Sequence, residues 1–257
     1  MIQAHLGPGD LTTAAATTST ASITAPIPAN TLQGDVLLAA VSSDIVGQLY
    51  TDTPGWARLG PARLPGGAVR DLAIFHAFTA EGVPGPPVIT QISASRLSLA
   101  VFRVTGAHQT ERYTGSTSWS GSDSSANTDT FVLPGTGAEG LTIAAAYGNT
   151  NAAQGPVTQA TFDGLPADIQ IVSHGAGSPG GSSATTLVLK ALNRPGPFTL
   201  AWGKTIANSQ GFALTIPAEP EATWEARYVL GGQLVQVTLE GVQSANGTRR
   251  PIAALRR

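Results

Sequence analysis

Residues that could carry catalysis are few in this chain, and their spacing follows no catalytic pattern. None of the 257 residues is a cysteine, which removes thiol nucleophiles, cysteine-bound zinc and disulfides. No Gly-x-Ser-x-Gly sequence surrounds any serine, so the sharp turn that presents a hydrolase nucleophile is missing. The histidines have no partner two or four residues away that would favour a metal. They are His5, His76, His108 and His174. The sequence therefore predicts a protein that is not an enzyme.

The acidic residues and the glycine motif have structural explanations. Asp44 and Asp52 flank one loop, and Asp123 and Asp129 flank a run of serine and asparagine, where aspartate caps turns. Such loops also suit calcium, so a loop calcium site stays an open alternative, although no cofactor is predicted. The stretch 135–140 fits G-x-G-x-x-G, but a dinucleotide site needs a helix after it. Here an apolar strand is predicted to follow, so we interpret the motif as a turn.

Residues suited to contact with a partner gather in two places. Trp119 lies in a wholly polar stretch, 117–121, predicted as a loop, where an exposed tryptophan suits a partner or ligand. Beyond Pro220, Gly231-Gly232 and Asn246-Gly247 are hairpin signals that predict a three-stranded meander. One face of this meander is apolar: Trp224, Tyr228, Val235, Val237 and Leu239. The last nine residues add four arginines, which suit ion pairs at an interface or form a solvated basic tail. They are Arg249, Arg250, Arg256 and Arg257.

The elements that must position these residues are predicted to be strands. Charged residues make up only 12% of the chain and hydrophobic residues 42%, with 30 glycines and 18 prolines. This composition is typical of short strands joined by turns. No segment keeps an apolar 3.6-residue period for three turns, so we expect essentially no helix. The runs 36–42 and 141–146 are apolar at nearly every position, which predicts central strands buried on both faces.

Internal repetition organises these strands. The run 34–40 is echoed by 140–146, the run 70–78 by 185–192, and the run 95–107 by 208–218. We therefore predict an all-β fold: a jelly-roll-like antiparallel β-sandwich built from two similar halves, plus a small C-terminal β-meander. The predicted boundaries are an N-terminal arm (1–16), the sandwich (17–218, with halves 17–107 and 124–218) and the meander for docking (219–257). One large sandwich is favoured, and two small sandwiches are the alternative.

Four of these segments together resemble a known module. They are Pro28–Ser42, Thr53–Leu59, Leu72–Phe78 and Leu99–Gly106. Their order resembles a β-sandwich module of minor tail proteins from phages that infect actinobacteria, a module also found in some actinobacterial surface proteins. Leu141–Pro217 is similar to the second part of that module, and Leu230–Leu255 resembles the short strands that end such tail proteins. The resemblance implies a structural or host-contact role in the virion and carries no catalytic residues.

The function expected from this resemblance is that of a phage virion structural protein. A minor tail protein that contributes to tail-tip or fibre assembly, or to host attachment, is favoured over a capsid decoration protein or head fibre. A bacterial surface carbohydrate-binding module is a further alternative. Expected partners are the chain itself, as a homo-oligomer and by analogy with tail spikes a trimer, other virion proteins, and a host cell-wall glycan. A net charge of −2 argues against nucleic acid, and the lack of a long apolar run argues against a membrane. With no signal peptide at its N-terminus, the chain is expected to be made in the host cytoplasm and located in the virion.

Overall fold

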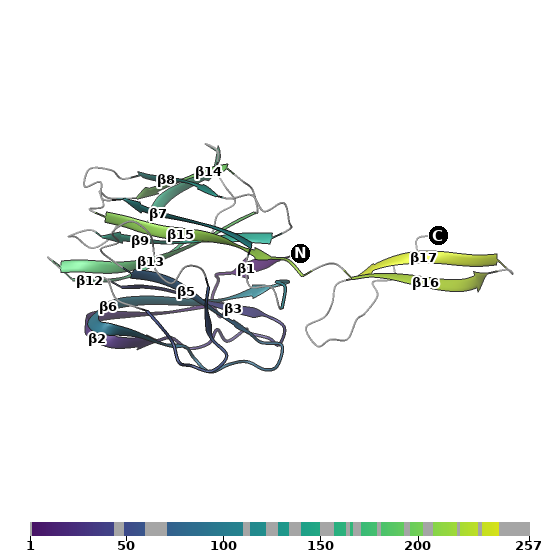
Figure 1. The fold of residues 1–257 in the computed structure, drawn as a ribbon, viewed down its shortest axis with the longest axis horizontal. Coiled ribbons are helices and arrows are strands. Elements are labelled where there is room, and N and C mark those ends of the chain that lie inside the picture. Colours follow the sequence, from purple (N-terminus) through teal and green to yellow (C-terminus); the bar gives the residue numbers. More distant parts are fainter. Residues whose placement is uncertain are drawn as a thin grey trace.

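The strands predicted from the composition and the apolar runs dominate the structure, a computed structural model of residues 1–257 (Figure 1). It describes the backbone of residues 2–43, 49–59, 71–109, 114–121, 128–133, 140–149, 157–162, 165–166, 171–178, 181–192, 196–202, 208–219, 222–230 and 233–241. Side chains are described for residues 2–43 except 17, and for 49–59, 71–109 and 216–219. Every regular element in these ranges is a strand, and every pairing of strands is antiparallel, which confirms the all-β prediction.

The first sheet has six strands in the order β1-β6-β3-β5-β4, with β2 also paired to β6. Its strands are β1 (Gln3–His5), β2 (Leu11–Thr24), β3 (Val36–Ser43), β4 (Ala57–Leu59), β5 (Asp71–Phe78) and β6 (Val88–Thr105). The strand β3 is buried at all eight positions and lies between β5 and β6. This confirms that its unbroken apolar run marks a central strand covered on both faces.

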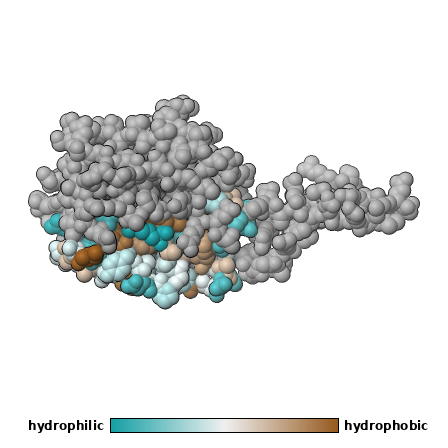
Figure 2. Space-filling model, in the orientation of Figure 1, coloured by the Kyte–Doolittle hydropathy of each residue, from teal (hydrophilic) through white to brown (hydrophobic). Residues whose placement is uncertain are grey.

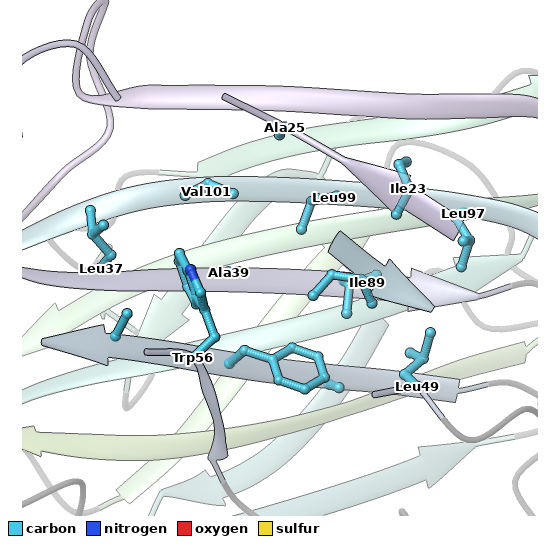
Figure 3. Packing of buried hydrophobic residues seen from close by; sticks show 14 residues of the cluster. Ile23, Ala25, Leu37, Ala39, Leu49, Trp56, Ile89, Leu97, Leu99 and Val101 are labelled. Carbon is cyan, nitrogen blue, oxygen red and sulfur yellow. The ribbon is translucent and has the colours of Figure 1, made fainter. Parts of the chain in front are cut away.

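Each face of this sheet contributes to a separate hydrophobic core. Leu72 and Ile74 lie in one core with Phe102, whereas Ala73 and Phe75 lie in the other, so successive residues of β5 alternate between the two cores. The second core is covered by residues from loops and from the far ends of β2 and β6, shown in Figure 3. Its covering side chains are Ile23, Ala25, Leu49, Trp56 and Ile89.

The two longest strands of the first sheet bend and contribute to two layers. Near its C-terminal end β6 pairs with β3, whereas Ile89 near its start pairs with Ile23 and helps to cover the second core. The register between β2 and β6 shifts at Ala16/Thr20 and again at Thr20/Ser22, where the pair bends. The predicted N-terminal arm, residues 1–16, belongs to this sheet, because it contains β1 and the start of β2.

Two further sheets follow along the chain. The five-stranded sheet has the order β12-β13-β9-β15-β7 and the four-stranded sheet the order β11-β10-β14-β8. The former contains β7 (Thr114–Gly121), β9 (Gly140–Asn149), β12 (Ile171–Ser178), β13 (Gly181–Leu192) and β15 (Asn208–Pro217). The latter contains β8 (Thr128–Leu133), β10 (Val157–Phe162), β11 (Leu165–Pro166) and β14 (Gly196–Trp202). The strand β9 is central, as predicted. Strand β13 contacts β3 and β6, and Ile216 of β15 joins the core beside Phe102, so strands of the two large sheets are in contact.

The last described element is a hairpin of β16 (Ala222–Leu230) and β17 (Gln233–Gly241). The two strands pair antiparallel from Ala222↔Gly241 to Leu230↔Gln233, across the predicted turn at residues 231–232. They form a two-stranded sheet of their own, which extends away from the larger sheets in Figure 1. The predicted third strand of the meander lies outside the described residues.

Candidate interaction surface

The register of the C-terminal hairpin brings the predicted contact residues onto one face. Trp224 pairs with Leu239, Ala226 with Val237, and Tyr228 with Val235. Because side chains alternate between the two faces of a strand, these six positions share a face and form three cross-strand rows. We call these six residues the hairpin apolar face. The sequence prediction named five of them, and the register adds Ala226.

The opposite face of the hairpin carries a different set of residues. Glu225 pairs with Thr238, Arg227 with Gln236, and Thr223 with Glu240. All the charged residues of β16 and β17 therefore occupy one face, and the hairpin apolar face carries none. No other described strand pairs with either β16 or β17. A lone two-stranded hairpin is only marginally stable in water. The hairpin apolar face is therefore a candidate surface for contact with another apolar surface.

A short hydrogen-bonded junction connects the hairpin to the two large sheets. Ala107, just beyond β6, forms an antiparallel bridge with Ala218, just beyond β15. The His108 N–H donates to the Pro217 carbonyl (2.9 Å), and the Glu219 N–H donates to the Gly106 carbonyl (2.8 Å). Hydrogen bonds thus hold the chain in place up to Glu219, three positions before β16 begins.

Side chains reinforce this junction. The Gln109 N–H donates to Oε2 of Glu219 at 3.3 Å, and Nε2 of Gln109 donates to the Gly34 carbonyl at 2.8 Å. The contacts link three segments that are far apart in the sequence: the loop before β3, the end of β6 and the chain that leads to β16. Sequence reasoning missed them, because single polar residues in loops show no periodic signal.

The remaining predicted contact residues are not brought to the hairpin by any described pairing. Trp119 was predicted in a loop, and this was wrong: it lies in β7, the edge strand of the five-stranded sheet, opposite Gly211 of β15. The serines and threonines around it (Thr114–Gly121) read as a loop, but pairing with β15 makes them a strand. The four arginines of the last nine residues lie outside the described residues.

A second polar site, also missed from the sequence, holds the N-terminal segment against β6. Arg103 Nε donates to Asp10 Oδ1 at 2.7 Å, and its Nη1 lies 3.3 Å from Asp35 Oδ2. Asn30 Nδ2 also donates to Asp10 (3.0 Å), and the Leu32 N–H donates to Asp35 (2.9 Å). We call Arg103, Asp10 and Asp35 the Arg103 clasp.

The electrostatics of the Arg103 clasp favour its charged state. Hydrogen bonds from Arg103 and Asn30 lower the pKa of Asp10 below its ordinary value. Burial alone would lower the pKa of Arg103, but the hydrogen bond to Asp10 and the charge of Asp35 outweigh it and raise the pKa. The hydrogen bonds and ion pairs of the clasp thereby hold the segments around Asp10 and Asp35 against β6, which is a structural role.

A third ion pair fixes the loop before β4. Arg58 Nη1 donates to the Leu49 carbonyl at 2.7 Å, and Nη2 lies 3.9 Å from Asp71 Oδ1. Burial lowers the pKa of Arg58, whereas the Asp71 charge acts in the opposite direction. His76 is buried in β5 with its ring 5.0 Å from the ring of Phe78. Among the described residues, no three His, Asp or Glu side chains form a group that could hold a metal ion.

Comparison of the chain with family models, with curated proteins and with solved structures gave no match. Within the described ranges, no helix has the length and apolar character to cross a membrane. The described residues in view in Figure 2 mix hydrophilic and hydrophobic side chains. The hairpin is therefore the strongest candidate for an interaction surface in the described part of the chain.

Proposed function

We propose that this chain is a structural protein of a phage virion, a minor tail component that joins other chains through its C-terminal hairpin. The observation that carries the proposal is the hairpin itself: an apolar face without charges, on a two-stranded sheet that no other described strand extends. The hydrogen-bonded junction supports it, because it holds the chain in place up to Glu219, three positions before β16 begins. The resemblance of the strand pattern to the tail-protein module supports the assignment to a phage tail.

The proposal includes the finer architecture, two related jelly-roll-like halves. Matching β6, β3, β5 and β4 to β15, β9, β13 and β12 gives the same order of strands in both large sheets. A two-fold axis that relates the halves would exchange β3 with β9 and β5 with β13. A contact of β3 with β13 should then be matched by a contact of β5 with β9, and both contacts are present. Ala107 and Ala218, which end two echoing segments, pair with each other, as residues on such an axis would.

Within this architecture, two stacked sandwiches are better supported than one large sandwich. Among the residues whose side chains the structure describes, the core that contains Trp56 consists of residues before position 102, all from the first half. The core that contains Phe102 lies on the other face of the same sheet and includes Ile216 from the second half. In this arrangement the halves pack back to back, each with an interior of its own.

The proposal is tested in purified particles of the phage that encodes the chain. We expect mass spectrometry to detect the protein in the particles and immunogold labelling to place it on the tail. A chain truncated after Ala218 should be made but not incorporated. Labels on the head would instead favour the capsid decoration protein. Particles that lack the protein, or incorporation of the truncated chain at the wild-type copy number, would contradict the proposal.

A further inference from the structure

The hairpin apolar face needs a cover, and the geometry of the hairpin points to its composition. We propose that the cover is the same hairpin of two further copies of this chain, and that three hairpins close into one six-stranded antiparallel barrel. The inference rests on the proposed function, and it specifies the partner of the C-terminal segment. Three observations carry it: the charge of each face, the area that one face offers, and the free edges of the two strands.

The distribution of charge suits association of identical copies. Glu225, Arg227 and Glu240 all occupy the face opposite to the hairpin apolar face. Identical apolar faces can therefore meet without burying an unpaired charge, which would cost several kcal/mol. A partner of different sequence would need a matching apolar strip, whereas a second copy supplies one by definition. In the barrel the charged positions stay on the outer, hydrated surface.

The area of the face argues for more than two copies. Nine residues at about 3.4 Å per residue give a strand of roughly 30 Å. Two strands spaced about 4.8 Å apart then offer a face of roughly 300 Å². Two such faces in contact bury roughly 600 Å², about half of the lower limit for a stable specific interface. Each added copy brings another face into the same core.

The edges of the hairpin decide how the copies close. In the described structure β16 pairs only with β17, so each strand has one edge without a strand partner. Two stacked hairpins would leave all four of these edges open. Three hairpins in a ring place β16 of each copy against β17 of the next, antiparallel, so that no edge remains. The smaller Ala226–Val237 row, between the rows that contain Trp224 and Tyr228, suits the layered interior of a narrow barrel.

The test compares the full-length chain with two variants at adjacent positions. Val237→Glu places a charge on the hairpin apolar face, and Gln236→Glu places the same charge on the opposite face, where it pairs with Arg227. Light scattering coupled to size exclusion should give three times 26.1 kDa for the wild type and for Gln236→Glu. Val237→Glu should give a single copy, with the unfolding midpoint of the two large sheets unchanged.

The opposite results would overturn the barrel. A wild type that is monomeric at every concentration, a stable dimer, or a Val237→Glu variant that remains trimeric would each contradict it. The inference can also fail separately from the proposed function. A protein that is monomeric in solution yet enters particles through its hairpin would refute the barrel alone. A trimer that no particle contains would refute the virion role alone.

Discussion

The first sheet and the C-terminal hairpin use the same alternation of residues with different outcomes. In the first sheet both faces are apolar, and both are covered by other parts of the same chain, which leaves β3 with no exposed position. In the hairpin only one face is apolar, and no other described strand extends it. An apolar strand face therefore becomes core or interface according to what the chain brings against it, and composition alone does not decide which.

The largest effect is expected where the first sheet is most deeply covered. Phe75 and Phe102 lie in the two opposite cores and are 2% and 0% exposed. Replacing either with alanine removes a buried ring and leaves a cavity, so each change should lower the free energy of unfolding by about 3–5 kcal/mol. Chemical denaturation followed by tryptophan fluorescence measures this change.

The matched control for these two variants is Ile92→Ala. Ile92 belongs to β6, as Phe102 does, but its side chain is 69% exposed. Its removal should change the free energy of unfolding by less than about 0.5 kcal/mol. Equal losses for Ile92→Ala and Phe102→Ala would contradict the assignment of the core beside Phe102.

The parts of the first sheet that were predictable are those with a local signal. The run of apolar residues in β3 and the alternation in β5 each fix which residues face which core, because a strand repeats every two residues. The same period gave five residues of the hairpin apolar face before any register was known. Local alternation is thus sufficient for faces and for central strands.

The features that escaped prediction depend on residues far apart in the sequence. Arg103 contacts Asp10 across 93 positions, and nothing near either residue signals the pair. Trp119 is in a strand because β15 pairs with it, although its own neighbours are typical of a loop. The strand β6 continues across Ser93, and its pairs with β2 on either side, Ser22 with Thr90 and Thr20 with Ser95, likewise join residues far apart in the sequence. Register and long-range ion pairs are tertiary properties, so the period of one segment cannot reveal them.

A smaller loss should follow when the Arg103 clasp is opened. Arg103→Met keeps the length of the side chain but leaves Asp35, only 6% exposed, without its cation. A carboxylate left unpaired in a buried position destabilises the folded state, and we expect a loss of about 2–4 kcal/mol. Asp10→Asn, at the more exposed carboxylate, should cost less. A loss for Arg103→Met no larger than that for Ile92→Ala would show that the clasp does not stabilise the first sheet.

The clasp also predicts how stability depends on pH. The pKa of Asp10 is lower in the folded state than its ordinary value of 3.8, so the folded state favours the charged carboxylate. This stabilisation is complete above the unfolded pKa and is lost as the pH falls through the folded pKa. Denaturation series from pH 7 to pH 2 should therefore show a loss from this group only in the acid range, below about pH 4. The loss should be smaller in Asp10→Asn, and an equal acid slope in that variant would assign it to other carboxylates.

The smallest effect should come from removing the hairpin, which sharpens the contrast with the first sheet. Truncation after Glu219 keeps the bridge between Ala107 and Ala218 and the contact of Gln109 with Glu219, but removes β16 and β17. No other described strand pairs with these two, so the free energy of unfolding of the remaining sheets should change by less than about 0.5 kcal/mol. The measurement is made at a protein concentration low enough to keep the full-length chain monomeric, because association would stabilise it by mass action. A loss of several kcal/mol on truncation would mean that the hairpin apolar face packs on its own chain.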